Sequence, residues 1–273
     1  MTSVLTEQDG RVLVATLNRP HVLNAFDREM TDRLARVVDV AEADPTVSVL
    51  LVTGAGRAFS SGYDLSPQPD PPAGSFLTAD LFRKLTLFPK PLLLAINGIG
   101  VGVGATIVSF ADVAVVAESA RLRCPFVSMG LTAEAGSTYQ FSRLLGPQRA
   151  AWFLMSGAWL SAAACVETGL AVESVPDADL RARAMEMAAT LAAQPLDSLL
   201  ETKRLLTAPH QEQLIASIRA ENQAVTRLMS TPTYQEIIGA FRARRAPDFS
   251  QGNLALYERA DGHQAETGEP TGD

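Results

Sequence analysis

Glu134 is the residue of this chain whose surroundings best suit proton chemistry. It lies within residues 129–139 (MGLTAEAGSTY), between a turn and a helical run, with no other charged residue nearby. A carboxylate buried among apolar groups has a raised pKa and can act as a general base near neutral pH. The same position also suits a first-turn glutamate that is stabilised by the helix dipole. The spacing leaves both interpretations of Glu134 open. Two other carboxylates also have simple structural interpretations: Asp64 suits a turn or a helix cap, and Asp112 suits the start of a strand.

Two glycine-rich segments follow apolar runs that are typical of buried strands. The first, residues 97–104 (NGIGVGVG), leads into an apolar, helix-like stretch, which is the context of a nucleotide-binding loop. The Rossmann spacing G-x-G-x-x-G fails, because its last position falls on Val103 or Ala105, and no Gly-Lys-Ser/Thr follows. Two interpretations remain: close packing of a strand on a helix, or a backbone N–H aimed at a developing anion.

The second segment, residues 53–65 (TGAGRAFSSGYDL), offers tight turns and two serines, Ser60 and Ser61. Neither serine lies in the G-x-S-x-G pattern of a hydrolase nucleophile. The chain has three histidines: His21, His210 and His263. The first lies in a Pro-His turn and the last in a polar C-terminal stretch, so a Ser-His-Asp triad is not expected. No His/Cys pair has ligand spacing, so we expect no metal site.

The elements that must position these residues alternate between strands and helices. Four apolar runs predict strands: residues 11–18, 47–53, 91–97 and 112–117. Between the first two, apolar residues from Phe26 to Ala41 recur with the period of an amphipathic helix. Continuous apolar runs are typical of strands buried on both faces. Strands separated by helical stretches predict an α/β layered architecture with crossover connections.

The pattern changes after residue 195. Residues 196–206 and 213–229 show helix periodicity with no strand between them, and Pro232 is placed to begin a further helix that runs to about Arg245. We therefore expect a core over residues 1–195 and a helical region over residues 196–260, which packs on the core or on another subunit. Residues 261–273 are polar and acidic and are expected to be disordered.

Composition excludes several classes of partner. The chain has 273 residues, of which 47% are hydrophobic and 19% charged, and its formal net charge is −7. This charge argues against nucleic acid or an anionic membrane as a partner, since both need clustered Lys and Arg. Two cysteines are too few for a disulfide scaffold, and no apolar run approaches the roughly 18 residues of a membrane span. The N-terminal residues lack the pattern of a signal peptide, so we expect a cytoplasmic protein.

Several ordered motifs together resemble the enoyl-CoA hydratase/isomerase (crotonase) superfamily over most of the chain. Residues 17–20 (LNRP) and 23–25 (LNA) are similar to the family's L-N-R-P…L-N-A, and residues 53–65 to its T-G-x-G-x-A-F-x-x-G-x-D-L. Residues 97–98 (NG) with the glycines after them, 144–146 (LLG) and 169–173 (GLAVE) also fit. The resemblance implies an α/β fold, a crotonase-like spiral of ββα units that ends in a helical trimerisation region.

The resemblance also implies a substrate and its binding groups. The substrate is an acyl-CoA thioester, and two backbone N–H groups, carried over to Ser61 and Val103, form an oxyanion hole. A shift from Val103 to Gly102 or Gly104 stays open, because the family usually has glycine there. Substrate and CoA contacts fall on these residues: Val22, Ala25, Ser60, Ser61, Gly62, Tyr63, Asp64, Leu65, Gly102 and Phe126. Candidates for the CoA phosphates are Arg19, Lys84 and Arg244 or Arg245. No metal or redox cofactor is implied, and the assembly is a homotrimer or a dimer of trimers.

The sequence departs from the hydratases of the family. Those enzymes hold a water between two glutamates, and at these positions the chain has Thr106 and Phe126. Glu134 falls where the Δ3,Δ2-enoyl-CoA isomerase branch has its single base. We therefore predict an acyl-CoA double-bond isomerase that uses Glu134. The alternatives are a hydratase or another crotonase-type enzyme with a different acid/base group, and a non-catalytic acyl-CoA-binding member.

Overall fold

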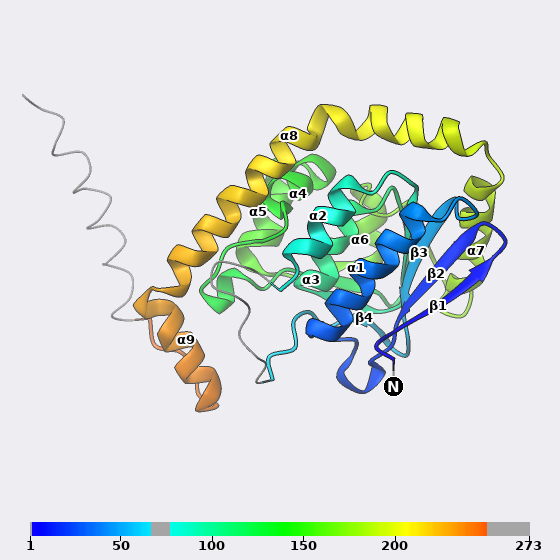
Figure 1. The fold of residues 1–273 in the computed structure, drawn as a ribbon. Helices are drawn as coiled ribbons and strands as arrows, with labels where there is room; N and C mark the ends of the chain where they lie inside the picture. Colours follow the sequence, from blue (N-terminus) through cyan, green and yellow to red (C-terminus); the bar gives the residue numbers. More distant parts are fainter. Residues whose placement is uncertain (1, 67–76, 250–273) are drawn as a thin grey trace, which may run out of the picture.

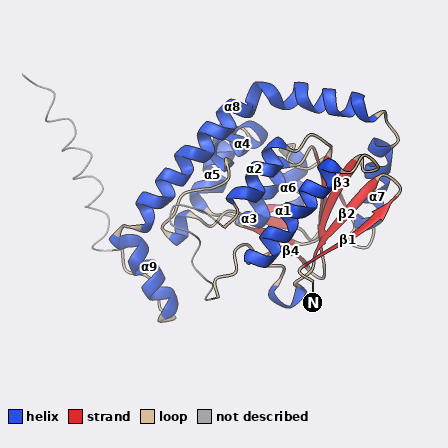
Figure 2. Cartoon of the chain, viewed as in Figure 1, coloured by secondary structure: helices blue, strands red, loops and turns tan. Residues whose placement is uncertain are grey.

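The computed structural model describes residues 2–66 and 77–249, which form two sheets and the helices around them (Figures 1 and 2). The larger sheet has the order β1-β2-β3-β5-β7-β10. Its strands are β1 (Val4–Asp9), β2 (Val12–Leu17), β3 (Val49–Gly54), β5 (Leu92–Ile96), β7 (Val113–Ala117) and β10 (Glu173–Val175). The smaller sheet has the order β4-β6-β8-β9, with β4 (Ala58–Ser60), β6 (Ile99–Val101), β8 (Arg121–Arg123) and β9 (Leu160–Ser161).

The four predicted strands are all present, as β2, β3, β5 and β7. They pair in parallel, with Leu50 opposite Leu92 and Leu93 opposite Val113. Each apolar run is buried on both faces, as its composition predicts. β1, which pairs antiparallel with β2, is absent from the prediction because only its first residue is buried and its sequence has no apolar alternation.

The chain repeats one ββα unit in which the first strand joins the large sheet and the second joins the small one. β3 and β4 lead to α2 (Ala79–Leu87), and β5 and β6 lead to α3 (Val103–Thr106). β7 and β8 lead to η3 (Val127–Met129) and α4 (Ser137–Leu145). This arrangement confirms the expected spiral. It also makes β4, β6 and β8 parallel neighbours, so the segments that follow them gather at one edge.

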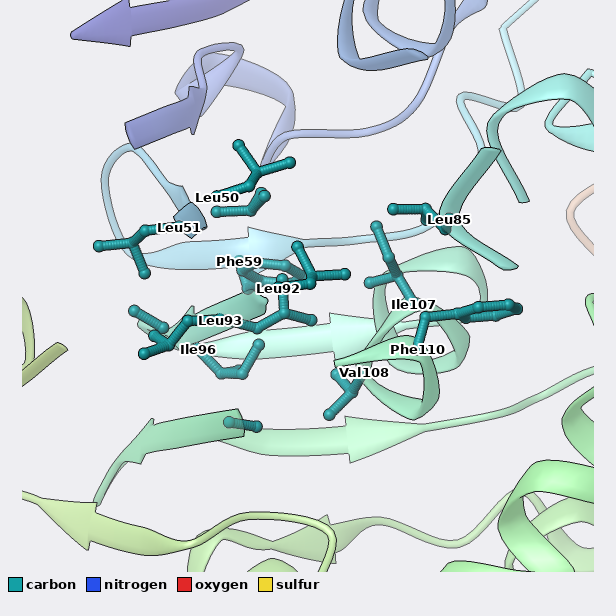
Figure 3. Close-up of a cluster of buried hydrophobic side chains, with 14 of the residues drawn as sticks. Leu50, Leu51, Phe59, Leu85, Leu92, Leu93, Ile96, Ile107, Val108 and Phe110 are labelled. Carbon is teal, nitrogen blue, oxygen red and sulfur yellow. The ribbon is translucent and has the colours of Figure 1, made fainter. Parts of the chain in front are cut away.

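Helices cover the large sheet on both faces. α1 (Arg28–Ala43) begins at Asp27, whose carboxylate accepts the N–H of Met30 at 2.8 Å, and α7 (Leu180–Ala192) packs on β3, β5 and β7. Leucines of the strands meet Leu85 of α2 and the aromatic ring of Phe110 in the core (Figure 3). The remaining elements are η1 (Pro20–Val22), η2 (Ile107–Phe110), α5 (Pro147–Ser156) and α6 (Ala162–Glu167).

The C-terminal region is helical, as predicted, but its first two segments are one helix. α8 (Leu196–Met229) continues through Pro209, and Figure 1 shows that it bends along its length and lies across α4. Lys203 ties α8 to the core through Asp112 at 2.7 Å and the Lys90 carbonyl at 2.8 Å. α9 (Pro232–Arg242) begins at the predicted proline. The region thus packs on its own core; its role in assembly stays a prediction, and the tail, 261–273, lies outside the described residues.

No helix in residues 2–66 or 77–249 is long and apolar enough to cross a membrane. The same residues contain no group of three His, Cys, Asp or Glu side chains that could hold a metal ion.

Candidate active site

The carboxyl ends of β4 and β6 lie against each other through glycines. A Cβ on Gly62, whose φ is +98°, would lie 2.9 Å from the Val101 carbonyl oxygen, and a Cβ on Gly104 would lie 2.6 Å from that of Ser60. Both distances are too short for a side chain, so these positions require glycine. Close packing of a strand on a helix, one of the two interpretations of the glycine-rich segment, is therefore present in the structure.

Two backbone N–H groups next to these glycines in the chain have no hydrogen-bond partner among the described residues. Val103 is the first residue of α3, where an N–H has no partner within the helix. Within residues 2–66 and 77–249, neither the Val103 N–H nor the Tyr63 N–H makes a hydrogen bond. The N–H of Ser61 donates to the Leu23 carbonyl at 2.9 Å, and that of Gly102 donates to the Arg123 carbonyl at 2.9 Å. The Ser61 N–H, which the resemblance assigns to an oxyanion hole, is therefore already bonded within the fold, and the N–H of this loop that stays unbonded among the described residues is that of Tyr63.

The loop that precedes α1 holds the end of β4 from the other side. Buried Asn24, at a φ of +56°, donates to the Ala55 and Ala58 carbonyls at 2.9 and 2.8 Å and accepts the Arg19 N–H at 2.8 Å. Arg19 forms ion pairs with Asp27 at 3.2 Å and Asp64 at 3.0 Å. These contacts bring residues 19–27 and 58–64 together.

The other predicted contact residues have distinct positions around these loops. The Val22 carbonyl accepts a hydrogen bond from the Ser61 hydroxyl at 3.2 Å, and the Ala25 carbonyl accepts one from the Arg19 guanidinium at 2.7 Å. The buried Ser60 hydroxyl accepts the Gly62 N–H at 3.2 Å, while Leu65 is exposed beside the segment that is not described. The backbone of this loop is therefore fixed by its own side chains.

The Glu134 residue is half-buried, and one of its two carboxylate oxygens has no hydrogen-bond partner among the described residues. Its Oε2 accepts the Tyr63 hydroxyl at 3.2 Å, and that hydroxyl lies 2.6 Å from the Thr78 hydroxyl. Its Oε1 is buried and has no hydrogen-bond partner among the described residues. The pKa of the Glu134 carboxyl is raised to about 7, chiefly because the group is buried; the Tyr63 hydroxyl opposes this rise, and the negative charge of Glu221 adds to it. A buried carboxylate with one free oxygen suits transfer of a proton near neutral pH.

A cavity of about 370 Å³ opens at Glu134 between α2 and α8. Most of its wall is apolar, and Glu134 is the single carboxylate among the described residues that line it. The apolar and small lining residues are Ala79, Phe82, Leu87, Ala135, Ile215 and Ile218; the polar ones are Thr78, Arg83, Thr86, Arg219 and Asn222. A water-poor space of this size accommodates an acyl group, and burial against it keeps Glu134 basic.

Neither of the two positions that carry glutamates in hydratases holds a proton-transfer group. The Thr106 hydroxyl is buried and donates to the Val103 carbonyl at 3.3 Å, within its own helix. The Phe126 ring is buried, and a Cβ on Gly102 would lie 4.0 Å from it. The Phe126 ring thus lies close to Gly102, the residue before Val103.

Most of the basic residues considered for the CoA phosphates already have carboxylate partners. Besides Arg19, Lys84 pairs with Asp39 at 2.5 Å and with Asp80 at 3.2 Å, and Arg245 pairs with Glu236 at 2.5 Å. These contacts make the paired residues poor candidates, because a phosphate would have to displace a carboxylate. Arg244 is exposed at a φ of +51° and stays a prediction.

Sequence reasoning did not find Glu221, Thr78 or the α8 wall of the cavity. Glu221 lies 85 residues after Gly136, to which it bonds, within a long helix whose charged residues look alike in sequence. No spacing rule connects it with Glu134. Buried Thr78 precedes α2 and carries no motif of its own. Only the packing of α8 on α4 brings Glu221 and the α8 residues to the site.

A two-sheet spiral of ββα units with a cavity beside a buried carboxylate defines the class of the protein. The chain matches the family described as enoyl-CoA hydratase/isomerase over residues 7–252. It is 33% identical to 1,2-epoxyphenylacetyl-CoA isomerase of Escherichia coli K12 over 92% of this chain and 99% of that protein. It is 30% identical to 2,3-dehydroadipyl-CoA hydratase of the same organism, over 91% and 99%.

A solved structure agrees with this assignment. The enoyl-CoA hydratase/isomerase of Pseudoalteromonas atlantica T6c superimposes with a TM-score of 0.87 at 28% identity, over 91% of this chain and all of that one. The chain belongs to the enoyl-CoA hydratase/isomerase family, whose substrates are acyl-CoA thioesters. Isomerases and hydratases both occur among these relatives, so the choice between them depends on the residues of the site.

Proposed function

We propose that this enzyme moves the double bond of a 3-enoyl-CoA to the 2-position, with Glu134 as its single acid/base group. The observation that carries the proposal is the buried Glu134 Oε1, which has no partner among the described residues; Glu134 also lines a cavity in which the described residues provide no second carboxylate. A hydratase needs two groups to activate and place a water, and Thr106 and Phe126 can do neither. A double-bond shift needs only one group, which returns the proton that it has removed.

In the proposed reaction the thioester carbonyl oxygen accepts the N–H groups of Tyr63 and Val103. The Glu134 carboxylate takes a proton from C2, and the electron pair of that C–H bond moves to form a dienolate, whose negative charge lies on the thioester oxygen. The protonated Glu134 then gives the proton to C4, the double bond between C2 and C3 forms, and the carbonyl is restored. Atoms and charge balance without water, metal or redox cofactor.

The backbone N–H groups are essential to this scheme because the C2 proton of a thioester is only weakly acidic. Donors aimed at the developing oxyanion lower the barrier, and the loss of one such donor costs about 3 kcal/mol. Neither donor depends on its side chain, which explains how valine replaces glycine at position 103. The glycines at 62 and 104 hold the two strand ends together.

The test is a coupled pair of assays with trans-3-hexenoyl-CoA and crotonyl-CoA on the wild type, Glu134→Gln and Glu118→Gln. Glu118 is an exposed glutamate, so its variant controls for the same substitution outside the site. We expect the wild type and Glu118→Gln to convert the 3-enoyl substrate to the conjugated 2-enoyl product. Glu134→Gln is expected to lose roughly 10²–10⁴-fold in kcat, the range for removal of a general acid/base, while it still binds CoA esters.

Product analysis identifies the reaction. An isomerase forms only 2-enoyl-CoA, whereas a hydratase forms 3-hydroxyacyl-CoA from crotonyl-CoA. Hydration at a rate that Glu134→Gln leaves unchanged would overturn both the reaction and the base. Binding of both esters without turnover of either would also overturn the 3-enoyl assignment, in favour of another acyl group or a non-catalytic role.

A further inference from the structure

The Glu221 side chain of α8 is buried at the start of α4. Its Oε2 accepts the N–H of Gly136 at 2.6 Å, and its Oε1 accepts the N–H and the hydroxyl of Thr138 at 2.8 and 2.5 Å. Only 4% of Glu221 is exposed. Because both oxygens accept hydrogen bonds from N–H or O–H groups, these contacts favour the ionised carboxylate and oppose the effect of burial, which raises the pKa of Glu221. A buried anion with three donors is held in one place.

These donors belong to the turn that carries Glu134. Gly136 precedes the first residue of α4, and the Glu134 carbonyl accepts the N–H of Ser137 at 3.0 Å. Ala135, between Glu134 and Gly136, has a φ of +60°, a left-handed conformation that disfavours alanine, and Gly136 follows at +75°. Such a turn persists only where neighbouring contacts hold it. The bonds of Glu221 to Gly136 and Thr138 supply that support from the next layer of the structure.

Glu221 also carries the like charge that acts on Glu134 among the residues that the structure describes, and its oxygens lie on the N–H groups of the turn just after Glu134. The other titratable groups around Glu134 are the Tyr63 hydroxyl from the β4 loop, the Cys124 thiol after β8, Arg83 of α2 and Arg219 of α8. The two arginines lie on exposed rims of the cavity, where solvent screens them. Buried charges are screened far less, so removal of Glu221 would have the larger effect on Glu134.

We propose that Glu221 is the positioning residue of this site: it holds the turn that carries Glu134 and faces that carboxylate with a fixed negative charge. The proposal rests on the proposed function, in which Glu134 is the base. It follows that the C-terminal helix takes part in catalysis, because the base is correctly placed and fully basic only when α8 is docked on α4. The like charge keeps the pKa of Glu134 high, so loss of Glu221 must lower this pKa.

The test compares the pH profile of kcat for the wild type, Glu221→Gln and Glu221→Met with two controls. Glu212→Gln removes the same charge from an exposed position of α8. Thr138→Val removes one donor to Glu221 and leaves the charge in place. We expect both neutral variants at 221 to shift the acidic limb to lower pH by roughly half a unit to one unit. Their plateau in kcat should fall about tenfold, with little change in KM, because the base is weaker and less well placed.

The controls separate electrostatics from structure. Glu212→Gln should match the wild type, and Thr138→Val should lower kcat without moving the acidic limb. A variant that only loosened the fold would lower its melting temperature and its active fraction and leave the pH profile unchanged. If both neutral variants at 221 fold and keep the wild-type acidic limb, the proposal is wrong. If one fails to fold, the other decides.

A direct titration keeps this inference separate from the proposed reaction. Carbon-13 NMR of the labelled glutamate carboxyls, with Glu134→Gln to assign the resonance, reports the pKa of Glu134 without a substrate. If the wild type does not isomerise 3-hexenoyl-CoA, the proposed function fails. A lower Glu134 pKa in Glu221→Gln would still support the electrostatic link, and an unchanged value would overturn it.

Discussion

Tyr63 and Asp64 are neighbours in the chain, yet their side chains enter two very different polar clusters. Asp64 joins the Arg19 cluster, formed by Arg19, Asn24, Asp27 and Asp64, and Tyr63 joins the Glu134 site, formed by Tyr63, Thr78 and Glu134. Consecutive side chains of an extended segment point to opposite sides, which separates the two clusters. One short loop thus supports the fold on one side and a cavity on the other.

The two clusters differ in how completely their hydrogen bonds are made. In the Arg19 cluster, the Asn24 side chain accepts one hydrogen bond through its oxygen and donates two through its NH₂ group. The Arg19 guanidinium contacts two carboxylates and the Ala25 carbonyl. In the Glu134 site one carboxylate oxygen is buried and unpartnered among the described residues. A buried polar atom without a partner is costly, so its presence points to a bound molecule or to catalysis. The following predictions test this contrast.

The largest effect on folding is expected in the Arg19 cluster, from Asn24→Ala. This change removes three buried or part-buried hydrogen bonds and takes away the side-chain partners of the Ala55 carbonyl and the Arg19 N–H, while the Ala58 carbonyl keeps the Asn97 amide at 3.2 Å. We expect the free energy of unfolding to fall by roughly 3–5 kcal/mol, measured by denaturation in urea. Asn24→Gly is the matched variant, since glycine accepts the φ of +56° without strain. A loss below about 1 kcal/mol in both variants would show that the cluster does not support the loop.

In the Glu134 site, loss of the polar group should have the opposite effect on stability. We expect Glu134→Gln to raise the free energy of unfolding at alkaline pH. The folded pKa of about 7 lies above the model-peptide value of 4.5, so the unfolded chain binds fewer protons between these values and stability falls as pH rises through that window. A shift of this size corresponds to roughly 3 kcal/mol. The neutral glutamine avoids this loss.

Melting temperatures at pH 5 and pH 8 test the prediction. Glu134→Gln should be clearly more stable than the wild type at pH 8 and close to it at pH 5. Glu118→Gln, at an exposed position, should show no such gap. Equal stability of Glu134→Gln and the wild type at pH 8 would mean that burial of the charged carboxylate costs the fold little.

The contrast also explains which parts of the protein the sequence could predict. Strands such as residues 47–53 and 91–97 are continuous apolar runs, so burial on both faces follows from composition alone. Glu134 stood out because no charged residue surrounds it. The hydrogen bond from the Ser61 N–H to the Leu23 carbonyl could not be predicted, because it depends on the turn that Asn24 stabilises. Glu221 could not be assigned either, because its role arises from the packing of two helices that are distant in sequence.

The smallest predicted effect, and the sharpest test of the boundary between the two clusters, is that of Tyr63→Phe. The variant keeps the backbone N–H and the ring but removes the hydroxyl that donates to Glu134 Oε2 at 3.2 Å. This bond lowers the pKa of Glu134, so its loss should raise that pKa and move the acidic limb of kcat to higher pH. At 3.2 Å the bond is long, and we expect a shift of less than about one unit. The direction is opposite to that expected for Glu221→Gln. Tyr139→Phe, which loses a hydroxyl contact to His210 at 3.0 Å, is the control and should leave the limb in place. A shift of Tyr63→Phe to lower pH would mean that this hydroxyl does not stabilise the ionised Glu134, and that Tyr63 serves the loop in the same way as Asp64.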